Sequence, residues 1–292
     1  MDQGTKAVFS AQSSFTQRRT GANDMASMSG VRVGVIGAGA IGGVVIDRLL
    51  NGAEARAEDL IACEPRDARR EEVAQRFHVR TTTDLGEAAA SDLIVLAVPP
   101  LEVAKVLRAI GERLGHRPVV VSFAAAVPLD ILEAALPAAT PVVRVNPNSP
   151  SLVGEGFNPV TYGSGVTGPA RALVDRFLTA LGASVEIRDQ AMNLYTALTA
   201  VGPTYFLPVL DAMITAGVEG GLTREAAVTA ATATARGTAM LAAQRAENPD
   251  QLKLFTGLRP LRDAEVRDLV KQAIADANSR MNSLQQQVTS PK

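Results

Sequence analysis

The sequence predicts the α/β fold class: an N-terminal Rossmann domain with a doubly wound parallel sheet, followed by an all-helical domain. A glycine-rich turn at residues 37–42 joins an apolar strand to an apolar helix. Short apolar runs then alternate with helical segments up to residue 187, which is typical of a parallel sheet. From Asp189 onward every segment has a helical pattern. We therefore expect a disordered tail over residues 1–30, the Rossmann domain over 31–188 and the helical domain over 189–292.

Composition and charge exclude several classes of protein. The chain has 292 residues, 47% of them hydrophobic, which is enough for a real core. Its net charge is −1, so we expect neither nucleic acid nor an anionic membrane as a partner. The single cysteine, Cys63, leaves no internal disulfide and favours a cytoplasmic location. The two histidines, His78 and His116, lack ligand spacing, so we expect no metal site.

The first 30 residues are polar, rich in Ser and Gly, and without periodicity. They contain no apolar core of the length a secretory signal needs. Met25 and Met28 both fit as an alternative start, and we expect disorder throughout this segment.

Apolar runs predict the strands of the sheet. The run at 92–98, DLIVLAV, is continuously apolar, as expected of a parallel strand buried on both faces. Helices are expected between the strands at 86–90, with Asp84 as N-cap, at 101–114 and at 169–181. The strands are expected at residues 31–36, 59–63, 79–81, 92–98, 118–123, 141–145, 160–162 and 184–187.

The helical half begins with a strongly apolar segment at 191–216, for which Asp189 is the expected N-cap. Gly202 and Pro203 interrupt this segment, so we do not expect it to span a membrane. Its apolar surface is too large for a small helical domain to cover alone.

The next helix, at 223–246, begins with Thr223 as its cap and has Ala and Thr around most of its circumference. A helix with so little polar face is usually buried. We therefore expect 191–216 and 223–246 to form the interface of a homodimer or larger homo-oligomer. A last helix with an apolar stripe is expected at 261–287.

The glycines of the turn have separate physical roles. Gly37 permits the tight turn, Gly39 lets a pyrophosphate approach the backbone, and Gly42 lets the helix pack against the strand. The N–H groups at the helix start then face negative charge. The order strand, GxGxxG and helix therefore predicts a dinucleotide site. Ligands of such sheets bind beyond the carboxyl ends of the strands. The expected cofactor-binding residues are thus Gly37, Ala38, Gly39, Ala40, Ile41, Gly42, Ala97, Val98, Pro99 and Asn146.

Two residues bear on the choice of nicotinamide cofactor. Glu64 lies 22 residues after Gly42, where an acidic side chain bonds the ribose hydroxyls and repels a 2′-phosphate. This favours NADH. Arg66 follows at once and is an alternative that accepts a 2′-phosphate, as in NADPH. For Arg69 and Arg70 we expect a solvated helix face.

Four stretches make the chain, over residues 31–285, resemble the pyrroline-5-carboxylate reductase family. They are VGVIGAGAIGGVVIDRLL, LIVLAVPP, RVNPNSPSLVGEG and TALTAVGPTYF with the helices after it. The third is the most specific, because it is similar to the family's RxMPNTPxxVGEG. The resemblance implies a Rossmann domain, a helical domain that dimerises, and hydride transfer from NAD(P)H to the C=N of a cyclic imine that carries a carboxylate.

The resemblance also implies catalytic residues. Asn148 matches the family's PNTP stretch and is expected to fix the nicotinamide ring or its ribose, and Thr204 of GPTYF is the second catalytic candidate. An alternative for Asn148 is a turn residue that satisfies its own backbone.

The chain departs from the family where members have a TSPGGTT-type loop that holds the substrate carboxylate. Here it reads LKLFTGLRPLRDAEV, so we expect that cradle to be absent. Candidate substrate residues that remain are Glu247, Thr256 and Arg259. We expect a reductase of an imine or related C=X bond that handles the carboxylate differently. The alternative is a dinucleotide-binding regulatory protein that has lost catalysis.

Overall fold

The structure is a computed structural model, and it describes residues 27–53, 55–115, 117–245, 249–252 and 261–290. The chain divides into two compact units. Unit 1 contains the described residues up to 124 together with 129–186, and unit 2 contains 125–128 and those from 187 onward.

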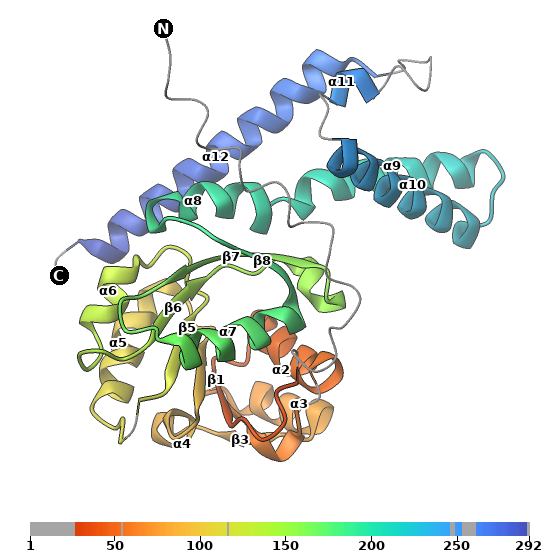
Figure 1. Ribbon diagram of the computed structural model, residues 1–292. Coiled ribbons are helices and arrows are strands. Elements are labelled where there is room, and N and C mark those ends of the chain that lie inside the picture. The colour runs from red at the N-terminus through yellow and green to blue at the C-terminus, as the bar shows by residue number, and fades with distance from the viewer. Residues whose placement is uncertain (1–26, 54, 116, 246–248, 253–260, 291–292) are drawn as a thin grey trace, which may run out of the picture. The chain divides into compact units, whose positions relative to one another are not determined.

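Unit 1 is built on an eight-stranded sheet of order β3-β2-β1-β4-β5-β6-β7-β8 (Figure 1). The strands from β3 across to β6 are parallel. The four strands β1, β2, β4 and β5 are buried along their whole length, which explains their continuous apolar sequences. The strands are β1 (Val33–Ile36), β2 (Leu60–Cys63), β3 (Arg80–Thr82), β4 (Leu93–Leu96), β5 (Val119–Ser122), β6 (Val142–Val145), β7 (Gly156–Tyr162) and β8 (Gly182–Glu186).

The sheet is mostly parallel, as predicted, and one junction near its edge departs from this pattern. β7 pairs with β6 in antiparallel fashion, and β8 then runs parallel to β7. The connection from β6 to β7 contains only the short turn η2 (Ser149–Val153). A parallel neighbour needs a crossover of about a dozen or more residues, usually with a helix, and this connection is too short for one.

Helices connect the strands of unit 1. Helix α4 has the expected cap, since the Asp84 carboxylate accepts a hydrogen bond from Gly86 N at 2.9 Å. Pro100 begins α5, where its missing N–H has no consequence. The helices are α2 (Ala40–Gly52), α3 (Asp67–Phe77), α4 (Leu85–Ala89), α5 (Pro100–Gly111), α6 (Leu129–Ala134) and α7 (Gly168–Leu181), with the 3₁₀ turn η1 (Ala57–Asp59) before β2.

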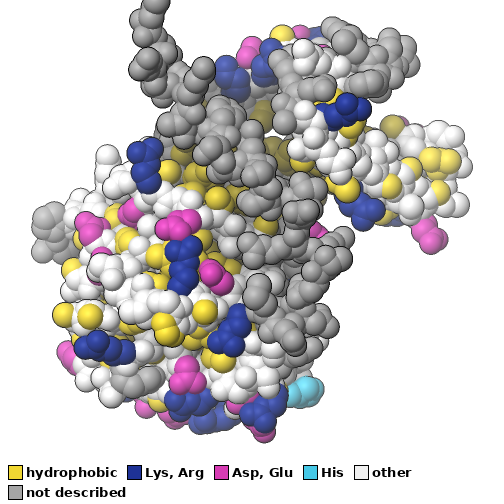
Figure 2. Space-filling model, viewed as in Figure 1, with side chains coloured by type: hydrophobic (Ala, Val, Ile, Leu, Met, Phe, Trp, Pro, Cys, Tyr) yellow, Lys and Arg dark blue, Asp and Glu magenta, His cyan; other side chains and the backbone are white. Residues whose placement is uncertain are grey.

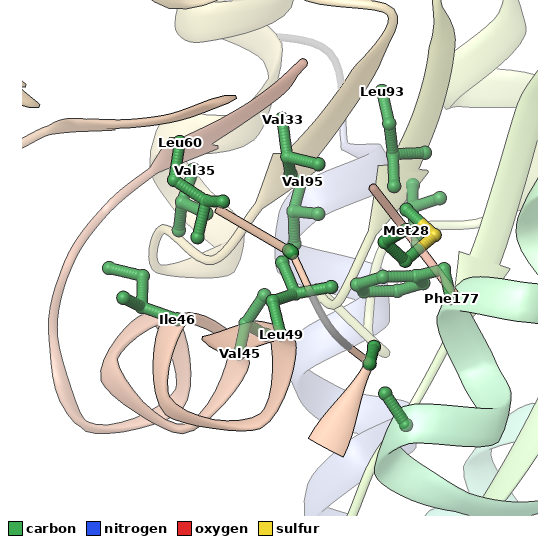
Figure 3. Packing of buried hydrophobic residues seen from close by; sticks show 14 of the residues in the cluster. Met28, Val33, Val35, Val45, Ile46, Leu49, Leu60, Leu93, Val95 and Phe177 are labelled. Carbon is green, nitrogen blue, oxygen red and sulfur yellow. The ribbon is translucent and has the colours of Figure 1, made fainter. Parts of the chain in front are cut away.

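The core of unit 1 lies between the sheet and the helices α2 and α7. Val45 and Leu49 of α2 lie beside Val95 of β4 and Phe177 of α7 (Figure 3). Met28 belongs to the same cluster, has no exposed surface, and donates its N–H to Ala53 O at 2.7 Å. The fold therefore begins before residue 31, and the expected tail over 1–30 is too long by the residues around Met28.

Unit 2 is helical in its described part, apart from its turns. Its first helical run starts with η3 (Asp189–Ala191), whose N-cap is Arg188 rather than the expected Asp189. Gly202 and Pro203 mark the start of α9, and the Thr223 hydroxyl oxygen accepts a hydrogen bond from Ala226 N at 3.2 Å before α10. The other elements are α8 (Met192–Tyr195), the π-helical turn η4 (Thr196–Ala200), α9 (Pro203–Glu219), α10 (Arg224–Arg245), α11 (Pro249–Leu252) and α12 (Asp263–Thr289).

Helices α9 and α10 pack on each other and expose much apolar surface. The described residues of α9 and α12 include no buried side chain, and in α10 Ala227 and Ala231 are buried. Figure 2 shows hydrophobic side chains along the α9–α10 pair. By length and composition alone, the helical run Asp189–Glu219 is apolar enough to cross a membrane. Only 11% of its most apolar segment is buried within this chain. Its apolar face is therefore open to a partner.

Candidate dinucleotide-binding site

The glycine-rich turn has the geometry that each of its glycines was expected to provide. Gly37 has φ +92°, and a Cβ there would lie 2.7 Å from Ala97 O. A Cβ at Gly42 would overlap the carbonyl oxygen of Gly37, so only glycine lets α2 approach β1. A Cβ at Gly39 would meet nothing within 4 Å. The space at Gly39 is thus open to a ligand.

The backbone N–H groups at the start of α2 have no hydrogen-bond partner in the described part of the chain. Among the described residues, no hydrogen bond is made by the N–H of Gly39, Ala40 or Ile41. Gly39 is the N-cap of α2, and there is no side chain at this position to satisfy them. Such a helix start attracts an anion, because unsatisfied donors and the helix dipole act together.

A cavity of about 100 Å³ lies beside this helix start. It collects residues from the carboxyl ends of three neighbouring strands, as the topology predicts. Phe123, at the end of β5, stacks on Phe177 with ring centroids 6.2 Å apart and gives the cavity a fixed apolar wall. The lining residues are Ile41, Ala97, Val98, Phe123, Asn146 and Pro147.

Four of these six residues were expected from the sequence, and Phe123 and Pro147 were not. Both lie at the ends of strands whose neighbours carry expected site residues. Their position at the common edge was the signal that could have identified them. Pro99, also expected here, is the N-cap of α5 and does not line the cavity.

Glu64 lies at the end of β2 and is only 3% exposed. Its Oε2 accepts a hydrogen bond from Ala38 N at 3.2 Å, so the carboxylate lies directly against the glycine-rich turn. Burial raises the pKa of the Glu64 carboxyl, but hydrogen bonds from the side chain and backbone of Arg66 and from Ala38 outweigh it, so its pKa is below the ordinary value. Glu64 is therefore an anion at neutral pH.

Arg66 holds this carboxylate with two donors, Nε to Oε1 at 2.7 Å and Nη2 to Oε2 at 3.2 Å. Its side chain is 68% exposed, so the guanidinium also faces solvent. Arg70 donates from Nη1 to the Glu64 carbonyl at 3.1 Å and is 24% exposed. The expectation that Arg69 and Arg70 form a solvated helix face is wrong, because both are bonded to backbone carbonyls of the site.

Comparisons with known proteins match both units. Residues 32–126 match the family model described as NADP oxidoreductase coenzyme F420-dependent, and residues 189–292 match the pyrroline-5-carboxylate reductase dimerisation model. The pyrroline-5-carboxylate reductase of Synechocystis sp. is 31% identical over 76% of this chain and 83% of its own length. That of Pseudomonas aeruginosa is 30% identical over 89% of this chain and 99% of its own length.

The chain belongs to the pyrroline-5-carboxylate reductase family. The crystal structure of Plasmodium falciparum pyrroline carboxylate reductase with NADP bound has the same fold, with a TM-score of 0.77 and 24% identity over 89% of this chain and all of that one. The chain is accordingly an NAD(P)H-dependent oxidoreductase of this family, and its helical domain forms homo-oligomers.

The family's PNTP-like stretch places Asn148 just before η2. Its Oδ1 accepts a hydrogen bond from Phe157 N at 3.0 Å, across the connection from β6 to β7. The side-chain oxygen of Asn148 therefore has a structural role in holding this connection. Asn146, two residues earlier, lines the cavity and donates its own N–H to Pro159 O at 3.2 Å.

In unit 2, Thr204 lies in the first turn of α9 and is exposed. Its hydroxyl donates to Val201 O at 2.7 Å, so the oxygen presents its remaining acceptor capacity outward. Three expected substrate residues, Glu247, Thr256 and Arg259, and the whole segment 253–260 lie outside the described residues. Arg262, just after them, pairs with Glu265 at 3.1 Å on the surface.

Proposed function

We propose that this protein reduces the C=N bond of a small cyclic imine with NAD(P)H. The observation that carries the proposal is the open helix start at Gly39 beside the cavity at the strand ends, in a chain of the pyrroline-5-carboxylate reductase family. Relatives of this chain are named pyrroline-5-carboxylate reductases, so that imine is the first substrate to test.

The residues present fit a dinucleotide. The N–H groups of Gly39, Ala40 and Ile41 would hold its pyrophosphate, and the Glu64 carboxylate lies where ribose hydroxyls would donate to it. The cavity wall at Phe123 and Val98 would hold the nicotinamide end and exclude water. When bound, the cofactor supplies the hydride, and the protein's contribution is to position the two reactants.

We propose that NADH is used at least as well as NADPH. The Glu64 carboxylate favours a ribose hydroxyl over a 2′-phosphate, because the hydroxyl can donate a hydrogen bond to it, whereas a neighbouring phosphate would repel it. Arg66 would have to release Glu64 before it could bind a 2′-phosphate, since its Nε and Nη2 are both held there. Comparison of the specificity constants for the two cofactors tests this, and a strong preference for NADPH would contradict it.

We assign catalytic positions to Asn148 and Thr204. Asn148 is fixed by Phe157 at the start of η2, next to the cavity residues Asn146 and Pro147. Thr204 Oγ1 has its proton engaged with Val201, so it is oriented to accept a hydrogen bond from a protonated imine nitrogen. Glu247, Thr256 and Arg259 stay proposed contacts to the substrate. We also propose a dimer as the assembly and the cytoplasm as its location.

The test is to follow oxidation of NADH and NADPH with a panel of cyclic imines, with and without an α-carboxylate, and with keto acids. We expect reduction of a cyclic imine. Because the family's SPGG loop is replaced by residues 255–258, we expect pyrroline-5-carboxylate itself to have a specificity constant below about 10⁴ M⁻¹s⁻¹. A higher value would show that the replacement carries the carboxylate as well. Binding of cofactor with no imine reduced would indicate a regulatory protein instead.

A further inference from the structure

Arg69 of α3 reaches across to the glycine-rich turn and is bonded to its backbone. Its Nε donates to Ala38 O at 2.6 Å, and its Nη2 donates to Gly39 O at 3.1 Å. The side chain is 21% exposed, and its third nitrogen, Nη1, pairs with Glu72 at 2.6 Å. All three guanidinium nitrogens of Arg69 thus have a partner, and its charge is paired with Glu72 on the same helix.

These two bonds fix the orientation of two peptide planes. In a trans peptide, the carbonyl of one residue and the N–H of the next point in opposite directions, and the described residues contain no cis peptide. Arg69 holds the carbonyls of Ala38 and Gly39, so the N–H groups of Gly39 and Ala40 must point away from Arg69. These two N–H groups are among those that lack a partner at the start of α2 in the described residues.

The Gly39 carbonyl also accepts a hydrogen bond from Gly43 N at 2.9 Å, whereas the Ala38 carbonyl has Arg69 Nε as its one donor among the described residues. Without Arg69, little would therefore hold the orientation of the peptide between Ala38 and Gly39. Gly39 has no side chain and no contacts at its Cβ position, and glycine changes its backbone angles at little cost. On the other side, Glu64 Oε2 holds the N–H of Ala38 at 3.2 Å, which fixes the preceding peptide. The turn is therefore held between β2 and α3 by one carboxylate and one guanidinium.

Gly43 makes room for this arrangement. A Cβ at Gly43 would lie 3.1 Å from Arg69 Nη2, which is tighter than an ordinary contact. The second glycine of the GG pair in IGGVV thus lets the guanidinium lie against the start of α2.

We propose that Arg69 is a positioning residue, which orients the Gly39 and Ala40 N–H groups toward the pyrophosphate of the nicotinamide cofactor. The proposal rests on the proposed function in that the site must bind NAD(P)H. Arg69 acts through the two carbonyls, because its charge is already paired with Glu72. It lowers the cost of ordering the turn when the cofactor binds.

Three variants test the proposal by calorimetric titration with NADH and with adenosine, which has no phosphate. Arg69→Gln should weaken NADH binding by about 10- to 100-fold, on the scale of one or two charge-assisted hydrogen bonds. Its affinity for adenosine should stay within about twofold, because the turn is needed only for the pyrophosphate. Arg69→Lys, which can reach one carbonyl, should give an intermediate loss. Arg76→Gln is the matched control on the same helix, where Arg76 lies over the Phe77 ring and away from the turn.

The difference between the change in NADH affinity and the change in adenosine affinity distinguishes a positioning role of Arg69 from a general loss of structure. Unchanged NADH affinity in a folded Arg69→Gln, or an equal loss for NADH and adenosine, would overturn the proposal. If Arg69→Gln does not fold, Arg69→Lys takes its place, and it should weaken NADH binding while its affinity for adenosine stays within about twofold; wild-type affinity for NADH in that variant would overturn the proposal as well. A wild-type protein that binds neither NADH nor NADPH would instead overturn the proposed function.

Discussion

Gly39 and Gly42 belong to the same turn but should respond to substitution in opposite ways. At Gly39 a new Cβ meets nothing within 4 Å, and φ is −66°, which any residue can adopt. Gly39→Val should therefore cost only about 1 kcal/mol of unfolding free energy, the scale of a poor N-cap residue. The valine methyl groups would fill the space where the pyrophosphate approaches, so NADH affinity should fall by at least about 100-fold, or roughly 2.7 kcal/mol.

At Gly42 the new Cβ would overlap the Gly37 carbonyl oxygen and lie 3.3 Å from Val35 Cγ1. Gly37 cannot move aside easily, because its N–H is bonded to Cys63 O at 2.9 Å. Gly42→Ala should therefore lose stability at the upper end of the overpacking range of about 1–3 kcal/mol. The assay is urea unfolding of both variants together with calorimetric titration of NADH. Wild-type affinity in a folded Gly39→Val, or wild-type stability in Gly42→Ala, would refute the reasoning.

Further outcomes are expected for Arg66, Cys63 and the oligomer. Arg66→Ala should weaken the binding of NADPH about tenfold, because one charge-assisted contact to the 2′-phosphate is lost. The affinity for NADH, measured by the same titration, should stay within about twofold. Equal losses of affinity for the two cofactors would contradict this. Burial raises the pKa of the Cys63 thiol to about 11, so native protein should resist thiol reagents at about pH 8. The same raised pKa makes a contribution to stability that is complete below about pH 8.5 and is lost as the pH rises toward 11, and a stability that increases over that interval would contradict it. Light scattering at micromolar concentration should show a dimer or a larger oligomer. Phe206→Glu should weaken this association, because the Phe206 side chain on α9 is 70% exposed. A monomeric wild-type protein would exclude the proposed interface.

The parts of the fold that the sequence predicted well are those in which local pattern and tertiary role agree. DLIVLAV is apolar at nearly every position because β4 is covered on both faces, and the GxGxxG turn has a steric requirement within the protein at Gly37 and Gly42. The direction of β7 could not be predicted this way, because it depends on the absence of a crossover helix between residues 145 and 156 and not on the composition of the strand.

Among the residues that line or touch the candidate site, those that follow strands were expected from the sequence, and side chains that reach it from elsewhere were not. Ile41, Ala97, Val98 and Asn146 follow from the topology. The role of Arg69 depends on a guanidinium that crosses from α3 to the turn, and RDARREEVAQR has the composition of an ordinary solvated helix. Likewise, no local pattern indicates that the Asn148 oxygen bonds an N–H nine residues further along the chain.

The two units owe their stability to different sources. Unit 1 has its own core between the sheet, α2 and α7. In α9 no described side chain is buried, and Phe206 and Leu207 are 70% and 58% exposed. Full burial of each such side chain contributes about 1.5–3 kcal/mol, which the described part of unit 2 does not supply by itself and a partner surface can supply. Because residues 189–292 match a dimerisation family, the partner is a second copy of this chain. The stability of the helical unit is therefore tied to protein concentration, whereas that of the dinucleotide-binding unit is not.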